Sequence, residues 1–124
     1  MSFGKFIVNR VKAFRYAFQG AWLLFGEPSI KVQVFCALVV TLAGFYFNIT
    51  QTEWILQILA IGLVLGIEGL NTAIEKIADF VHPDFHDLIG EIKDVAAGAV
   101  TFAACAAAII GFIIYVPYFL ALLE

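Results

Sequence analysis

Four polar side chains interrupt the most apolar stretch of the sequence. Residues 55–80 read ILQILAIGLVLGIEGLNTAIEKIADF, and Glu68, Asn71, Glu75 and Asp79 all lie in the second half of this segment. At about 100° per residue, a helix brings the four side chains onto one face, within about 80° of one another. Carboxylates in an apolar helix are costly unless they are paired or serve a function. The spacing therefore predicts a functional site along this face.

These residue types suit phosphoryl transfer to an alcohol. Mg²⁺ prefers hard oxygen ligands and often uses one or two carboxylates together with substrate phosphates, and Glu27 and Glu75 are candidates. Lys93 could offset phosphate charge. Glu68, placed deeper in the apolar segment, suits a general base acting on a lipid hydroxyl. The sequence contains neither a GxxxxGK[ST] phosphate loop nor the glycine-rich loop of protein kinases, which excludes the usual soluble kinase folds.

The composition indicates an integral membrane protein of one domain, residues 1–124. The chain is 63% hydrophobic and 14% charged, and its mean hydropathy is +0.98. A soluble domain typically has about 45–50% apolar and about 25% charged residues. Little of this chain can therefore form an ordinary water-exposed surface, and no nucleic-acid partner is expected.

The hydropathy pattern predicts an all-α fold with one surface helix and three transmembrane helices. Residues 3–25 form an amphipathic pattern, with aromatic and aliphatic side chains on one face and cations on the other, which is typical of a helix in the headgroup region. Three apolar runs have the length needed to cross a bilayer. We place these transmembrane helices at residues 32–49, 54–79 and 93–122.

Charge placement predicts the orientation in the membrane. The first 26 residues carry four Lys or Arg and no acid, Lys76 and Lys93 flank the loop at 80–93, and the link at 48–53 has neither Lys nor Arg. The positive-inside rule then places the N-terminus and the second loop on the cytoplasmic side. This arrangement gathers Glu27, Glu75, Asp79, Lys93 and Asp94 at one membrane face. Small residues in 96–108 favour close helix contacts, so we expect a homo-oligomer.

Two motifs carry a resemblance to a known family. The run from Glu68 to Asp79, EGLNTAIEKIAD, is followed by KDVAAGAV from Lys93 to Val100. Together they resemble the small prokaryotic diacylglycerol kinase family, which includes undecaprenol kinases. The segment YAFQGAW at 16–22 and Glu27 also fit, so the resemblance covers most of the chain.

The resemblance implies a homotrimeric helical bundle in the bacterial inner (cytoplasmic) membrane, with active sites shared between protomers on the cytoplasmic side. It implies phosphorylation of a lipid alcohol, diacylglycerol or undecaprenol, by ATP and Mg²⁺. It also implies roles for individual residues. These are Glu68 as catalytic base with Asn71 beside it, Glu27 and Glu75 as metal ligands, and Tyr16, Arg10, Asp84, His86, Lys93 and Asp94 as nucleotide contacts.

Two points stay open at this stage. The first is the lipid substrate, because Pro28-Ser29 follow Glu27 where several Gram-positive relatives have Arg-Asn. The second is the nucleotide contact on the surface helix, because either Arg10 or its neighbour Asn9 can occupy the matching position.

The alternative function is a small homo-oligomeric proton-coupled transporter with Glu68 as proton carrier. Transport gives no reason to gather the other charged groups at one interface. A membrane adaptor without activity leaves the polar face unexplained.

Overall fold

The computed structural model describes residues 1–124 and contains four α-helices and no strand. They are α1 (Phe3–Leu24), α2 (Pro28–Phe47), α3 (Gln51–Val81) and α4 (Asp87–Leu122). The last three are long and apolar enough to cross a membrane. The all-α prediction with one N-terminal helix and three spans is confirmed. Observed helices begin before the predicted spans, as at Asp87 rather than residue 93, because a helix can continue into the polar region beyond the bilayer.

Local sequence signals explain where the helices begin and end. Pro28 occupies the first turn of α2, where a missing N–H costs nothing. Asn48 ends α2 in the left-handed conformation at φ 52°, which Asn tolerates better than most residues. Thr50 and Glu53 then form a reciprocal capping box at the start of α3. The link between α2 and α3 is therefore short and rigidly defined.

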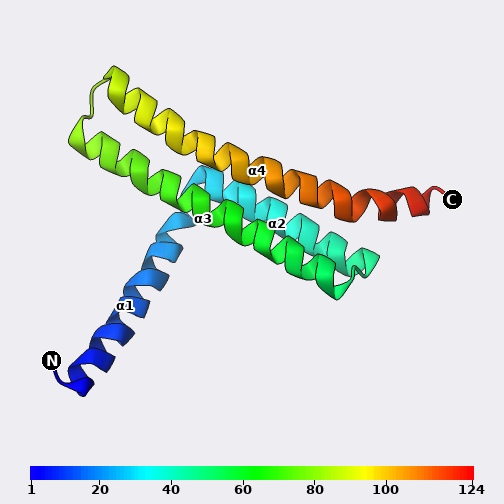
Figure 1. Cartoon of the computed structure of the whole chain (residues 1–124), viewed down its shortest axis with the longest axis horizontal. Coiled ribbons are helices and arrows are strands. Elements are labelled where there is room, and N and C mark those ends of the chain that lie inside the picture. Colours follow the sequence, from blue (N-terminus) through cyan, green and yellow to red (C-terminus); the bar gives the residue numbers. More distant parts are fainter.

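The three long helices lie side by side, whereas α1 points away from them (Figure 1). α3 packs along α4 over most of its length and contacts α2 less extensively. α1 meets the bundle only at its C-terminal end, where a Cβ added to Gly69 would lie 2.9 Å from the Cδ1 atom of Leu24. No residue of α1 is buried. This divergence is what a helix lying along a membrane surface requires.

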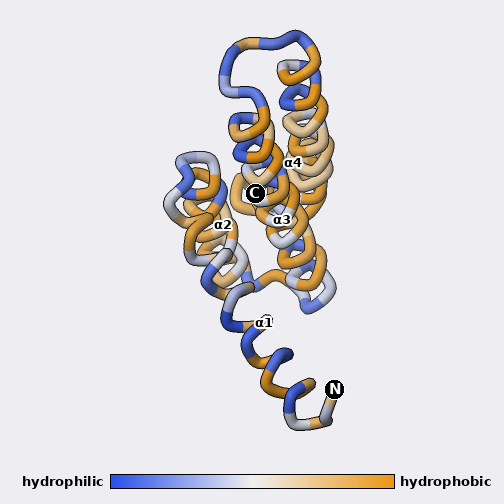
Figure 2. Tube along the Cα trace, turned by 90° about the vertical axis from the view of Figure 1, so that its left-hand side faces the viewer, coloured by the Kyte–Doolittle hydropathy of each residue, from blue (hydrophilic) through white to orange (hydrophobic).

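The helix lengths show which part of the bundle extends beyond a bilayer. At about 1.5 Å per residue, the 20 residues of α2 span about 30 Å, which matches a hydrocarbon core of about 30 Å. α3 has 31 residues and α4 has 36. Because α2 and α3 are tightly joined at one end, the excess length of α3 lies at the other, next to residues 82–86. We call this the loop end, and polar residues gather there (Figure 2).

The opposite end contains the small core of the bundle. Ile49, Ile114 and Tyr115 form its buried cluster. The Tyr115 hydroxyl lies 2.8 Å from the Val40 carbonyl and 2.5 Å from Gln57 Oε1, and Gln57 Nε2 donates to the same carbonyl at 3.2 Å. These bonds tie α2, α3 and α4 together. Only 13 of 124 residues are buried, so the apolar outer faces need lipid or other protein copies to cover them.

Candidate active site

Glu68 is buried where α2 crosses α3. Its side chain, on a residue only 6% exposed, accepts a hydrogen bond at Oε2 from Gln33 Nε2 across the helix interface, at 3.3 Å. Gln33 lies in the second turn of α2, so Glu68 sits just inside the loop-end boundary of that helix. A buried carboxylate held near a membrane interface can accept a proton from a hydroxyl group that reaches it.

Asn71 and Glu75 follow on the same face of α3. Asn71 Nδ2 donates to Glu75 Oε1 at 3.3 Å, while Asn71 Oδ1 is buried and has no hydrogen-bond partner. Glu75 is exposed. The pair thus presents an amide oxygen and a carboxylate, both hard oxygen donors, at the place where a divalent cation was expected. An unpaired buried acceptor costs about 1–3 kcal/mol, so a group that binds it would be favoured.

Glu27 occupies the junction between α1 and α2. Its Oε1 atom lies 3.5 Å from Nζ of Lys76, which belongs to α3. Nowhere in the structure do three or more His, Cys, Asp or Glu side chains come close enough to form a metal cluster. Mg²⁺ rarely needs such a cage, because it keeps waters and uses substrate phosphates as ligands. The residues present therefore fit a Mg²⁺–nucleotide site with few protein ligands.

Lys93 and Asp79 join the extended parts of α3 and α4. Lys93 Nζ lies 2.5 Å from Asp79 Oδ1, and both groups remain partly exposed. Asp94, the next residue of α4, is exposed and has no ion-pair partner. The structure thus places Lys93 and Asp94 at the loop end, beyond the region that α2 covers.

The loop between α3 and α4 is ordered by its own two histidines. His82 Nδ1 lies 2.8 Å from the Asp84 carbonyl oxygen, and His86 caps α4 by accepting a bond from Leu88 N–H at Nδ1. The two rings meet edge to face with centroids 5.2 Å apart. A small polar pocket of about 120 Å³ lies here, and its lining includes Asp84, His86 and Lys93. Three of the predicted nucleotide contacts therefore share one pocket.

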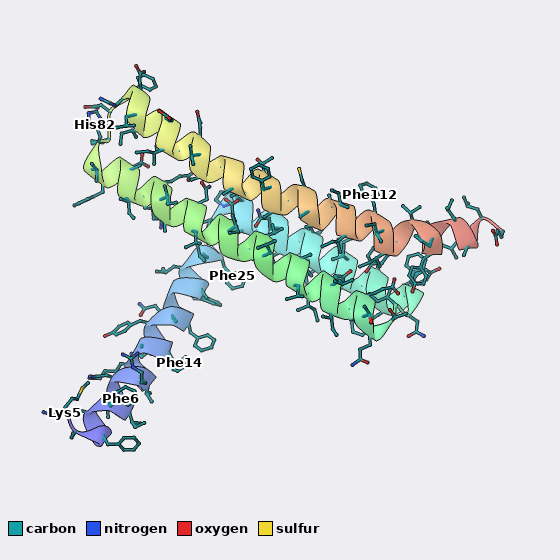
Figure 3. The ribbon with its side chains drawn as sticks, viewed as in Figure 1. Lys5, Phe6, Phe14, Phe25, His82 and Phe112 are labelled. Carbon is teal, nitrogen blue, oxygen red and sulfur yellow. The ribbon has the colours of Figure 1, made fainter.

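The predicted contacts on α1 lie apart from the others. Arg10 packs over the Phe6 ring of its own helix, 5.7 Å from the centroid, and Tyr16 is exposed. Figure 3 shows Phe6 and Phe14 on the arm that leads away from the bundle, whereas His82 marks the loop end. Within one chain, Arg10 and Tyr16 do not join the site around Glu68 and Glu75.

A cleft between α2, α3 and α4 leads away from this site. Its volume is about 430 Å³, and 13 of its 16 lining residues are hydrophobic. Gln33 lines it at the end nearer Glu68, and Gln57 and Tyr115 line the other end. Apolar clefts of about 300–1,000 Å³ with few polar groups are typical ligand sites.

Two residues of this site were not predicted from the sequence. In the sequence, Gln33 is a single amide in the apolar run 32–49, and Lys76 is one of the two lysines that flank the loop at 80–93. Both contact residues that lie far away in the sequence. Gln33 bonds to Glu68, 35 positions away in α3, and Lys76 pairs with Glu27 at the junction of α1 and α2. An isolated amide in a transmembrane segment was the available signal, because such a group needs a partner.

Comparison with known proteins assigns this arrangement of helices and polar groups to a class. The family model of prokaryotic diacylglycerol kinases matches residues 15–115, which include every predicted site residue except Arg10. The chain therefore belongs to the prokaryotic diacylglycerol kinase family, and it is a membrane-bound lipid kinase.

Individual relatives agree with this assignment. The undecaprenol kinase of Bacillus subtilis is 36% identical over 107 residues, which cover 86% of this chain and 87% of the relative. A diacylglycerol kinase of Synechocystis is 33% identical and covers 93% of this chain and 67% of the relative. The diacylglycerol kinase of Escherichia coli K12 is 28% identical, with 80% and 82% covered. None of these relatives supports the transporter alternative.

Proposed function

We propose that the protein transfers the γ-phosphate of ATP to the hydroxyl group of a membrane lipid, either diacylglycerol or undecaprenol, at the cytoplasmic face of the bacterial inner membrane. The observation that carries this proposal is the buried Glu68, which bonds to Gln33 at one end of an apolar cleft. Asn71 and Glu75 follow it along one helix face toward the polar loop end. Lipid and nucleotide can then meet at the interface.

In the proposed reaction, Glu68 accepts the proton of the lipid hydroxyl as the oxygen attacks the γ-phosphorus. The bond between this phosphorus and the β–γ bridging oxygen breaks, and ADP leaves. Glu27 and Glu75 would hold Mg²⁺, which offsets the negative charge of the phosphates. Asn71 positions Glu75 through its amide. Lys93, Asp94, Asp84 and His86 bind the nucleotide at the loop end.

We further propose that the active unit is a homotrimer with sites shared between protomers. Two observations support this. Arg10 and Tyr16 lie away from the site of their own chain, and most apolar side chains of the bundle are exposed. A neighbouring copy could bring its α1 to the site and cover part of the bundle. The lysine and arginine distribution supports a cytoplasmic N-terminus.

The test uses purified protein in lipid bicelles with radiolabelled ATP and, in parallel, diacylglycerol or undecaprenol. We expect Mg²⁺-dependent phosphorylation of at least one lipid, and loss of about 100-fold or more in kcat for Glu68→Gln. Glu75→Gln should show a similar loss that excess Mg²⁺ partly restores. Near-normal turnover by Glu68→Gln would refute the assignment of the base, and near-normal turnover by Glu75→Gln would refute that of the metal ligand.

A further inference from the structure

Gln33 is a polar residue that α2 does not need for its own structure. The predicted first span contains three polar residues, Gln33, Thr41 and Asn48. Thr41 donates to the Ala37 carbonyl in its own helix, and Asn48 ends the helix. Gln33 alone reaches across to another helix, where it donates to Glu68. An amide in an apolar helix is costly, so this contact calls for a role of its own.

The bond fixes one oxygen of the Glu68 carboxylate and leaves the other free. Gln33 Nε2 donates to Glu68 Oε2 at 3.3 Å, and no other side chain in the structure is bonded to Glu68. Asn71, one turn further along α3, bonds to Glu75 instead. A glutamate side chain has several rotatable bonds, so without Gln33 nothing within the chain would hold the carboxylate in one orientation.

The orientation of the Gln33 amide follows from simple electrostatics. Its oxygen would repel the Glu68 carboxylate, so its N–H group must face Glu68. Gln33 Oε1 is consequently left buried without a partner, although Gln33 lines the cleft. The unpaired Gln33 Oε1 costs about 1–3 kcal/mol, and the same orientation of the amide directs its N–H donor at Glu68.

We propose that Gln33 is a positioning residue for the phosphoryl-transfer reaction, holding the Glu68 carboxylate so that Oε1 faces the lipid hydroxyl. This inference rests on the proposed role of Glu68 as base. Gln33 acts through Glu68 and takes no proton itself. Because misplacing a reacting group by about 1 Å can cost about 100-fold in rate, loss of this bond should lower kcat far more than it weakens ATP binding.

The test compares three variants of the full-length protein in lipid bicelles. Gln33→Leu removes the amide and replaces it with an apolar side chain of similar size. Gln33→His restores an N–H donor at a similar reach. Thr41→Val is the matched control, because it removes a polar group from the same helix without touching Glu68. Kinetic constants for ATP and lipid, together with the thermal unfolding midpoint, are measured for each variant.

We expect Gln33→Leu to lower kcat about 10–100-fold with KM for ATP changed by less than about twofold. Gln33→His should recover part of the loss, and Thr41→Val should stay near wild type. A normal kcat for Gln33→Leu, or a loss in Gln33→His as large as in Gln33→Leu, would overturn the proposal. Measuring Glu68→Gln alongside distinguishes failure of the proposed role of Gln33 from failure of the proposed role of Glu68 as base. If it stays active, the assignment of the base fails, whereas an inactive Glu68→Gln beside an active Gln33→Leu refutes only the role of Gln33.

Discussion

Lys93 Nζ on α4 lies 2.5 Å from Asp79 Oδ1 on α3. This ion pair joins the two helices at the loop end, where the bundle extends past α2. Both partners are partly exposed, so the pair contributes little to stability, about 0–1 kcal/mol. The pair matters more for the position of Lys93. It holds the Lys93 ammonium group beside the pocket that also contains Asp84 and His86. Asp79 thereby positions a residue that we assign to the nucleotide.

Asp79→Asn should therefore raise KM for ATP several-fold while the free energy of unfolding changes by less than about 1 kcal/mol. Lys93→Met should have the larger effect, about 10–100-fold in kcat/KM, because it removes a charge-assisted bond to phosphate. Initial rates over a range of ATP concentrations check both values. An unchanged KM in Asp79→Asn would show that Lys93 reaches the nucleotide without this pair.

Lys76 and a divalent cation should compete for the carboxylate of Glu27. The ion pair at 3.5 Å occupies one of its oxygens, and the Lys76 side chain is largely exposed. Lys76→Gln should therefore lower the Mg²⁺ concentration needed for half-maximal activity by about two- to fivefold, whereas Glu27→Gln should raise it. Mg²⁺ titrations of the two variants give opposite shifts. Shifts in the same direction would argue against Glu27 as a metal ligand.

Tyr115→Phe should destabilise the bundle at the end opposite to the site. It removes the hydroxyl that bonds to Val40 and Gln57, so Gln57 Oε1 loses its donor at a cost of about 1–3 kcal/mol. At low temperature and saturating lipid, kcat should stay within about twofold of wild type, because the change lies far from Glu68. KM for the lipid is the constant that this change can affect, since Tyr115 lines the apolar cleft. Tyr46→Phe is the control, since Tyr46 is exposed and forms no side-chain hydrogen bond. Unfolding in detergent measures the difference.

Gly44 should tolerate no side chain. A Cβ at this position would lie 2.6 Å from the Trp54 ring, which is too rigid to move without disturbing the α2–α3 contact. We expect Gly44→Ala to cost about 1–3 kcal/mol through overpacking. Gly90→Ala is the comparison, because a Cβ there meets nothing within 4 Å and alanine favours helix. Equal unfolding midpoints for the two variants would contradict the close packing of Trp54.

Several features followed from the sequence because they depend on local patterns. The three spans and the surface helix come from apolar runs and amphipathic spacing, which reflect the helical period directly. The face shared by Glu68, Asn71 and Glu75 follows from the same period. The family follows from two short motifs. None of these inferences requires knowledge of which helix packs against which.

The tertiary structure alone decided which polar groups meet. The antiparallel packing of α2 on α3 pairs Gln33 with Glu68 and Glu27 with Lys76, and the packing of α3 on α4 pairs Asp79 with Lys93. The direction of α1 separates Arg10 and Tyr16 from the site. These outcomes depend on helix register and crossing, which a hydropathy pattern does not encode, because lipid-facing and protein-facing residues of a transmembrane helix are equally apolar.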